Sequence, residues 1–298
     1  MRPVDIGIVL LVVTIWGGNF IAMRIGALEI PPYFLLALRL SIAALALAWF
    51  VRSPRGMTLP LLGISFTMCI LHFGLALVGL KHVEAGAGSL AMQAAVPFAA
   101  LLAWIFFGET FGWRRVLGVA LAFAGLTMIS GVPQLGERSD MFLLMVISAL
   151  CFSVATIQIR HLGNKNFISI NAWVCIFSAP MAFLVSWVFE AGQWNALMVA
   201  QTPTILGIFY MGLIASVFGQ GLWYRLLPRY QTNQVMPYTL LVPVLGILFG
   251  IIFLDETLNW ELVVGGIITI TGVAIIVLRS SGKVKQEKLM AKQRNERL

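Results

Sequence analysis

The stretch "GETFGWRRVLG" at residues 108–118 recurs 147 positions later as "DETLNWELVVG" at residues 255–265. Arg114 and Arg115 of the first copy are replaced by Glu261 and Leu262 in the second. The repeat predicts a duplicated chain, and the exchanged charges indicate that its two copies face different surroundings. The residues that keep their spacing are Glu109 and Glu256, Thr110 and Thr257, Trp113 and Trp260, Gly118 and Gly265, and, beyond the two stretches, Gly125 and Gly272.

The composition places this chain in a lipid bilayer. Of its 298 residues, 60% are hydrophobic and 11% are charged, and the mean hydropathy is +0.93. A soluble domain carries about 25% charged residues. The net charge of +8 does not indicate nucleic acid, because seven of the 20 Lys and Arg residues lie in the last 20 positions and the others are scattered between apolar runs. No folded basic face remains to follow a phosphate backbone.

Ten apolar runs are long enough to cross roughly 30 Å of hydrocarbon as helices. The sequence therefore predicts an all-α integral membrane protein with ten transmembrane helices. An even number of crossings places both termini on one side, and Lys and Arg favour that side by nine to three without the C-terminal tail. The positive-inside rule then makes both termini cytoplasmic. The runs cover residues 4–25, 33–52, 59–80, 85–107, 115–131, 141–160, 169–189, 204–224, 232–253 and 261–279.

This topology explains the exchanged charges. The two copies follow the fourth and the ninth helix, so five crossings separate them and place them on opposite sides of the membrane. The first copy keeps its arginines in the cytoplasm, whereas the second is external. We therefore expect two inverted five-helix repeats, residues 1–133 and 134–280, around a central cavity, followed by a basic cytoplasmic tail at 281–298. Inverted repeats are typical of transporters that work by alternating access.

Polar side chains within membrane spans are costly, so they are the candidate substrate-binding residues. Each has a structural alternative. Gln93 either lines the cavity or forms a hydrogen bond to a neighbouring helix. Asn19 either binds substrate or lies beside Gly17 and Gly18, which would simply allow close helix packing. Arg39 binds a substrate carboxylate or extends to the interface, and His72 carries protons or is structural. The set is Trp16, Asn19, Arg39, His72, Gln93, Gln158, Trp173, Gln220 and Thr239.

The sequence also predicts hinges, a helix cap and the chemical class of the substrate. Pro97 and Pro243 hold nearly matching places in the two copies and are predicted hinges, and Asn171 is expected to cap the start of its helix. None of the 12 acidic residues lies in the middle of a span, so proton coupling would depend on His72, on the substrate, or be absent. One mid-span cation fits a neutral, zwitterionic or amphipathic small molecule better than a phosphate-rich one. Cys69, Cys151 and Cys175 lack metal-ligand spacing, so neither metal nor cofactor is expected.

These motifs resemble the drug/metabolite transporter superfamily, and specifically its ten-helix EamA type. The resemblance covers the chain except for the basic tail, and it is most specific at "GLIASVFGQGLWYRLLPRYQTNQVMPYTLLVPVLGILFGIIFLDET" (212–257). Other matching stretches are "WGGNF" (16–20), "LALRLSIAALAL" (36–47) and "GSLAMQAAVPFAALLAWIFFGET" (88–110). The resemblance implies a basket of ten helices in the inner membrane that exports amino acids or related metabolites. It assigns family motif positions to Trp16, Gly17, Asn19, Phe20, Arg39, Gln93, Arg229, Tyr230, Pro237 and Pro243.

This chain departs from its relatives at two places. Val154–Gln158 stands where relatives carry a tryptophan and an asparagine, and His72 replaces a glutamine.

The repeat and the resemblance together predict secondary export of small amino acids or amino-acid-derived metabolites. Multidrug, nucleoside or other small-metabolite efflux is the alternative. An intramembrane enzyme is disfavoured because no hydrolytic motif is present. A structural subunit would leave the repeat unexplained.

Overall fold

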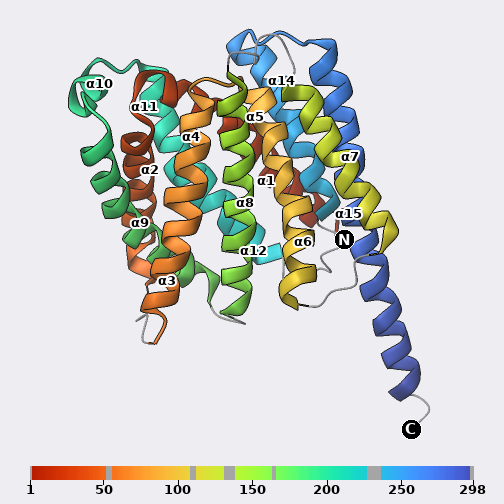
Figure 1. The fold of residues 1–298 in the computed structure, drawn as a ribbon. Helices are drawn as coiled ribbons and strands as arrows, with labels where there is room; N and C mark the ends of the chain where they lie inside the picture. Colours follow the sequence, from red (N-terminus) through yellow and green to blue (C-terminus); the bar gives the residue numbers. More distant parts are fainter. Residues whose placement is uncertain are drawn as a thin grey trace.

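The computed structural model describes residues 2–51, 56–107, 112–130, 138–162, 166–226 and 236–295, and all regular structure in these ranges is helical. The helices pack side by side in one bundle (Figure 1). Several spans consist of two or three consecutive elements. The elements are α1 (Pro3–Glu29), α2 (Pro32–Leu47), η1 (Ala48–Phe50), α3 (Thr58–Ile64), η2 (Ser65–Phe73), α4 (Gly74–Leu80), α5 (Ala85–Ala91), η3 (Met92–Ala94), α6 (Ala95–Phe107), α7 (Trp113–Ser130), α8 (Ser139–His161), α9 (Phe167–Phe189), α10 (Gln193–Val199), α11 (Thr202–Phe209), η5 (Tyr210–Gly219), α12 (Gln220–Leu226), η6 (Met236–Leu240), α14 (Leu241–Leu254) and α15 (Trp260–Asn295).

Nine of the described helical segments are long and apolar enough to cross a membrane. A tenth apolar segment, Tyr238–Leu254, is shorter than the other nine. It coincides with the predicted span 232–253, whose first residues lie outside the described ranges. The described part of the chain is therefore all-helical and has nine segments that could span a membrane.

The repeated glycines of the two copies pack directly against each other. A Cβ atom on Gly125 would lie 2.5 Å from the Gly265 carbonyl oxygen, and one on Gly118 would lie 2.8 Å from that of Gly272. Because the lower-numbered glycine of α7 meets the higher-numbered glycine of α15, the two helices are antiparallel, and Figure 1 shows them side by side. The Gly118 and Gly125 positions of α7 thus meet Gly272 and Gly265 of α15 in reverse order along the chain.

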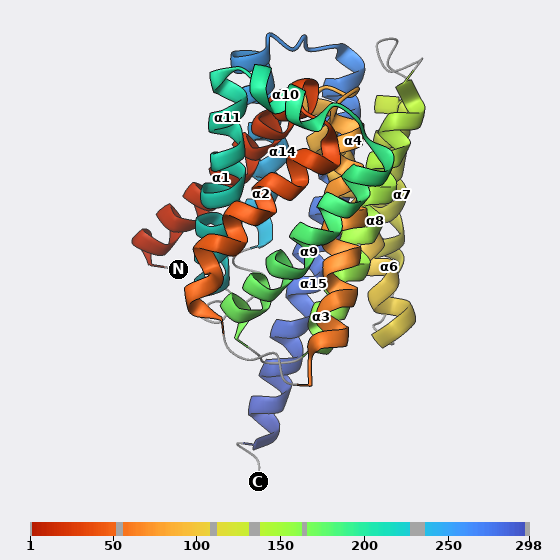
Figure 2. The same cartoon turned by 90° about the vertical axis from the view of Figure 1, so that its left-hand side faces the viewer.

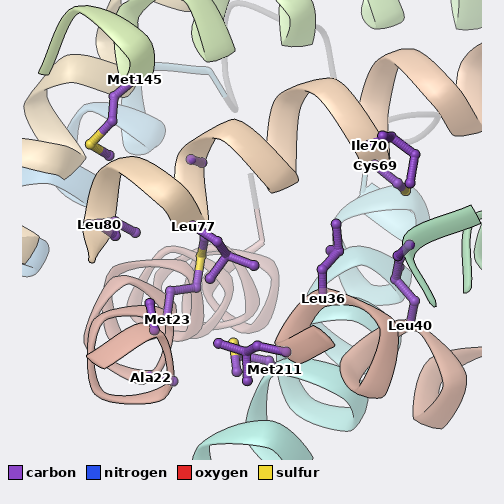
Figure 3. Close-up of a cluster of buried hydrophobic side chains, with 14 of the residues drawn as sticks. Ala22, Met23, Leu36, Leu40, Cys69, Ile70, Leu77, Leu80, Met145 and Met211 are labelled. Carbon is purple, nitrogen blue, oxygen red and sulfur yellow. The ribbon is translucent and has the colours of Figure 1, made fainter. Parts of the chain in front are cut away.

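The interior joins helices from both halves of the sequence. Figure 3 shows Met23, Leu36, Leu77, Met145 and Met211 converging from α1, α2, α4, α8 and η5. Polarizable, unbranched methionine side chains fill irregular spaces between crossing helices. The thiols of Cys69 and Cys175 are buried in this same cluster, whereas Cys151 is only partly buried.

A short helix, α10, lies between α9 and α11 where the sequence predicted only a connection. Gly192 precedes it with a φ of +74°, a conformation that glycine adopts at little cost. Trp194 of α10 packs edge-on against Phe34 of α2, with ring centroids 5.3 Å apart. Figures 1 and 2 place α10 and the α14–α15 connection at the same end of the bundle, opposite the C-terminus. We call this end the α10 face.

Candidate functional site

Arg39 lies at the centre of a buried polar cluster. Its side chain is 3% exposed, and its Nη2 donates to the Ser216 hydroxyl of η5 at 3.1 Å. The guanidinium carbon lies 4.4 Å from the centroid of the Phe73 ring. Ser216 donates its own proton to the Met211 carbonyl oxygen at 2.7 Å, which orients the hydroxyl as an acceptor for Arg39. The interface-seeking alternative for Arg39 is therefore wrong, because the side chain is held inside the bundle.

The partners of Arg39 come from two π-helices in corresponding spans. These segments, Ser65–Phe73 and Tyr210–Gly219, begin 145 positions apart. A π-helix widens the turn, and such segments occur frequently at functional sites. The bond from Ser216 to Met211 spans five residues, as π-helical spacing permits. The sequence carried no signal for this local geometry.

Asn171 also belongs to this cluster, which corrects its expected role as a helix cap. Its Nδ2 donates to the Ser216 carbonyl oxygen at 3.2 Å. The cap of α9 is Asn166, whose side chain accepts from the backbone N–H groups of Ile168 and Ser169. The helix begins earlier than the hydrophobic run suggested, so Asn171 lies one turn inside it. Its amide therefore links α9 to η5.

His72 is tied to α8 through Ser148. Nδ1 of His72 lies 2.9 Å from the Ser148 hydroxyl and 3.1 Å from the Ser148 carbonyl oxygen. The same hydroxyl donates to the His72 carbonyl oxygen at 2.8 Å, so it accepts from the ring, and Nδ1 carries the hydrogen. The ring also packs on Phe73 and Phe152, with centroids 4.6 and 5.0 Å away. The hydrogen bonds between His72 and Ser148 therefore connect η2 to α8.

Three expected site residues keep buried polar atoms without a hydrogen-bond partner among the described residues. They are donors on Arg39 (Nε and Nη1) and acceptors on Asn19 (Oδ1) and Gln158 (Oε1). The amide nitrogen of Asn19 makes a bond only with the Met23 sulfur, at 3.1 Å. Unsatisfied buried polar groups are costly and rare in native structures. Four of the five such atoms among the described residues belong to predicted site residues, and the fifth is the hydroxyl oxygen of Thr204.

Two further expected residues each lie four positions before a buried proline. These pairs are Gln93 with Pro97 and Thr239 with Pro243. A short 3₁₀ segment precedes each proline, Met92–Ala94 in one span and Met236–Leu240 in the other. Proline has no N–H for the carbonyl four residues earlier, which interrupts the α-helix there. Both polar side chains therefore stand where their spans change geometry.

The remaining expected residues lie at other places in the bundle. Trp16 of α1 packs against Trp223 of α12 with centroids 5.1 Å apart, and Trp173 packs against Phe177 within α9 at 5.2 Å. Gln220 begins α12 and is half-buried. Pro237 has no described side-chain environment, and Arg229 and Tyr230 lie outside the described residues.

At the α10 face, carboxylates accept hydrogen bonds from the first backbone N–H groups of neighbouring helices. Glu256 accepts from Ala85 at 2.5 Å and from Gly86 at 2.9 Å. Glu190 accepts from Tyr33 at 2.8 Å and Phe34 at 3.0 Å. Carboxylates are favoured at helix N-termini, where unpaired N–H groups and the helix dipole meet.

A third carboxylate, Glu29 of α1, accepts from the Gln201 backbone N–H at 2.8 Å. Each of these three contacts joins one half of the sequence to the other, and together we call them the α10-face closure. Asp255 has a left-handed φ of 54°, which ends α14 and turns Glu256 back toward α5. The repeat motif was visible in sequence, but this role for its glutamate was not.

A small charged network surrounds Glu256. Arg24 donates to the Leu80 carbonyl oxygen at 2.5 Å and interacts electrostatically with Glu256 and Glu84. Partial burial, followed by the nearby charge of Glu256, raises the pKa of Glu84 above its ordinary value, and Arg24 opposes that shift. Two carboxylates thus share one guanidinium at the α10 face. Among the described residues, no group of His, Cys, Asp or Glu could hold a metal ion.

Comparison with known proteins agrees with this architecture. The EamA-like transporter family model matches the chain twice, at residues 5–131 and 141–278. A solved crystal structure superimposes with a TM-score of 0.59 at 19% identity, covering 93% of this chain and 99% of the other, which shows a shared fold.

Several relatives are named as transporters or efflux pumps. A protein of Escherichia coli (strain K12), named "Probable amino-acid metabolite efflux pump", is 30% identical over 285 residues, covering 90% of this chain and 93% of that protein. A protein of Salmonella typhimurium with the same name is 30% identical over 277 residues, with the same coverage. An "Uncharacterized transporter" of Archaeoglobus fulgidus is 27% identical over 279 residues, covering 88% of this chain and 93% of that protein. The chain therefore belongs to the EamA-like transporter family, and the relatives above are named as a transporter or as efflux pumps.

Proposed function

We propose that this protein exports small amino acids or amino-acid-derived metabolites as a secondary transporter. The observation that carries the proposal is the set of unpartnered polar atoms inside the bundle. Arg39 offers donors, whereas Asn19 and Gln158 offer acceptors, from three different helices. Such a set complements a zwitterion, whose carboxylate accepts and whose ammonium donates. The relatives named as amino-acid metabolite efflux pumps support the same class of substrate.

Ten helices arranged as two inverted repeats are part of this proposal. Two separate family matches support the duplication, and the antiparallel contact between α7 and α15 supports the inversion. Equivalent helices that run in opposite directions fit a two-fold axis in the membrane plane. The tail and both termini then lie in the cytoplasm, the chain lies in the bacterial inner membrane, and the α10 face is external.

Cysteine labelling tests this topology at residues that precede equivalent helices. In a background without the three native cysteines, we expect Gly112→Cys to react only with reagent on the cytoplasmic side and Asn259→Cys only with reagent outside. Membrane-impermeant maleimide added to intact cells and to inverted vesicles distinguishes the two. Labelling of both positions from the same side would contradict the inverted arrangement.

Alternating access follows from this arrangement as a mechanism. The α10-face closure represents the state in which the external entrance is shut. The proline-interrupted spans at Pro97 and Pro243 are the proposed hinges, because both contain a 3₁₀ segment in which the α-helical bonding is already broken. Moving these spans would expose Gln93 and Thr239 to one side of the membrane and then to the other.

Transport by purified protein in proteoliposomes tests the function, with a panel of radiolabelled amino acids and a pH gradient imposed or absent. We expect accumulation of small amino acids by the parental protein and at least a tenfold lower rate for Gln93→Ala, because Gln93 stands at the interrupted turn. Thr127→Ala is the matched control, since the Thr127 side chain is exposed on α7 and its hydroxyl donates to the Phe123 carbonyl oxygen of the same helix. Parental rates for Gln93→Ala would remove Gln93 from the site.

Multidrug, nucleoside or other small-metabolite efflux is the second candidate function. The paired indole rings of Trp16 and Trp223, with centroids 5.1 Å apart, would suit a larger apolar ligand. Drug resistance of expressing cells, without transport of any amino acid in the panel, would favour it.

Proton coupling through His72 is a further prediction. If His72 relays protons, an imposed pH gradient changes the transport rate of the parental protein but not that of His72→Gln.

A further inference from the structure

Arg39 has more hydrogen-bond donors than the protein uses. A guanidinium carries five N–H groups, on Nε, Nη1 and Nη2. Ser216 accepts from Nη2, whereas Nε and Nη1 have no partner among the described residues. The neighbours of the guanidinium are the Phe73 ring and the ionisable side chains of Cys69, Cys175 and His72, none of which is a carboxylate. A buried cation is therefore present without a counter-ion from its described surroundings.

One complete two-donor edge of the guanidinium stays available in every arrangement of its hydrogens. The side edge is formed by the Nε hydrogen and one Nη2 hydrogen, and the end edge by an Nη1 hydrogen and the other Nη2 hydrogen. Ser216 takes only one Nη2 hydrogen. Whichever it takes, the other edge keeps both of its donors. Such an edge matches the two oxygens of a carboxylate.

We propose that Arg39 binds the carboxylate of the substrate through this two-donor edge, so that the transported molecule itself supplies the missing counter-ion. This inference rests on the proposed export function and narrows the substrate to carboxylates with a small or zwitterionic body. Phe73 holds the guanidinium in the empty carrier through a cation–π contact. The Ser216 hydroxyl of η5 accepts from the guanidinium, and Asn171 of α9 in turn donates to the Ser216 carbonyl oxygen.

The buried position explains why a carboxylate would be required and not merely preferred. An unpaired charge in a membrane interior is expensive, and a ligand that neutralises it relieves that cost on binding. A neutral amide or a cationic amine of the same size would leave the guanidinium unpaired. The structure therefore predicts that the carrier discriminates between substrates by the charge at their carboxylate end.

The test compares the best-transported amino acid of the radiolabelled panel with its amide and its decarboxylated amine. In the parental protein, we expect both analogues to compete at least tenfold more weakly for uptake. Arg39→Lys keeps the charge but loses the planar fork, so we expect an apparent affinity for the amino acid about 10- to 100-fold lower. Arg39→Gln should remove the preference for the carboxylate altogether. Arg115→Lys, at another buried arginine on α7, is the control.

The outcomes separate this inference from the proposed function. If the parental protein transports no amino acid, the proposed function itself fails. If it transports amino acid and amide equally well, export stands and the carboxylate contact is refuted. If the parental protein discriminates but Arg39→Lys and Arg39→Gln discriminate equally well, the carboxylate is bound elsewhere. If both variants fail to fold, two measurements on the parental protein test the contact instead. One is the comparison of the amino acid with its amide, and the other is whether the bound amino acid protects Arg39 from modification by phenylglyoxal. Modification of Arg39 that the amino acid does not slow would refute the contact.

Discussion

Gly125→Ala is expected to destabilise the protein by about 1–3 kcal/mol, the cost of overpacking a tight helix contact. The new Cβ would lie 2.5 Å from the Gly265 carbonyl oxygen and 2.6 Å from the Thr269 backbone nitrogen. Backbone atoms on a helix cannot move aside as a flexible side chain can, so α7 and α15 must separate. Thermal unfolding in detergent, followed by intrinsic fluorescence, measures the loss.

The matched control for this substitution is Gly63→Ala in α3. A Cβ atom there meets nothing within 4 Å. Since alanine is a better helix former than glycine by roughly 1 kcal/mol, we expect this variant to be neutral or slightly more stable. If Gly125→Ala also proved neutral, the close antiparallel contact between α7 and α15, and the support that it gives to inverted repeats, would be lost.

Glu256→Ala is expected to open the α10 face. The substitution removes the acceptor for the Ala85 and Gly86 backbone N–H groups, and a hydrogen bond to a charged group contributes about 1.5–3 kcal/mol. In a background without native cysteines, Ser89→Cys reports on the opening, because Ser89 is 1% exposed and lies one turn below these N–H groups. We expect Glu256→Ala to raise the rate of maleimide labelling at this position several-fold.

Two variants show whether the hydrogen bonds are responsible. Glu256→Gln keeps an oxygen acceptor and should label at an intermediate rate. Glu261→Gln removes a carboxylate five residues farther along, in the first turn of α15, and should leave labelling unchanged. Equal labelling of Ser89→Cys in the parental and Glu256→Ala backgrounds would mean that other contacts hold this face closed.

The membrane class and most span boundaries could be predicted from sequence because they depend on local properties. Hydrocarbon requires runs of apolar residues that satisfy their own backbone, and such runs are readable along one chain. Shorter elements could not be predicted in the same way. The helix α10 depends on the turn at Gly192 and on the contact of Trp194 with Phe34, a residue far away in sequence.

The candidate site was predicted in part. Arg39, Asn19 and Gln158 were predicted because burying a charge or an amide in a membrane is costly. In the structure these three residues have buried polar atoms without a hydrogen-bond partner among the described residues. Asn171 was assigned wrongly, because a helix start inferred from hydrophobicity missed the cap at Asn166. Ser216 was overlooked because placing a serine in a membrane span costs little free energy, so its presence is no signal. Its role as the hydrogen-bond acceptor for Arg39 is visible only in the structure.

The sequence by itself determined that this chain is duplicated, helical and membrane-embedded, and which polar residues lie within its spans. These conclusions need only composition, spacing and the energy of transfer from water to hydrocarbon. Only the tertiary structure decided which of those residues meet, that Glu256 closes the start of α5, and that Arg39 keeps an unused donor edge. The reason is physical: hydrogen-bond pairing depends on distances between helices, and residues far apart along the chain reach those distances only after the bundle has packed.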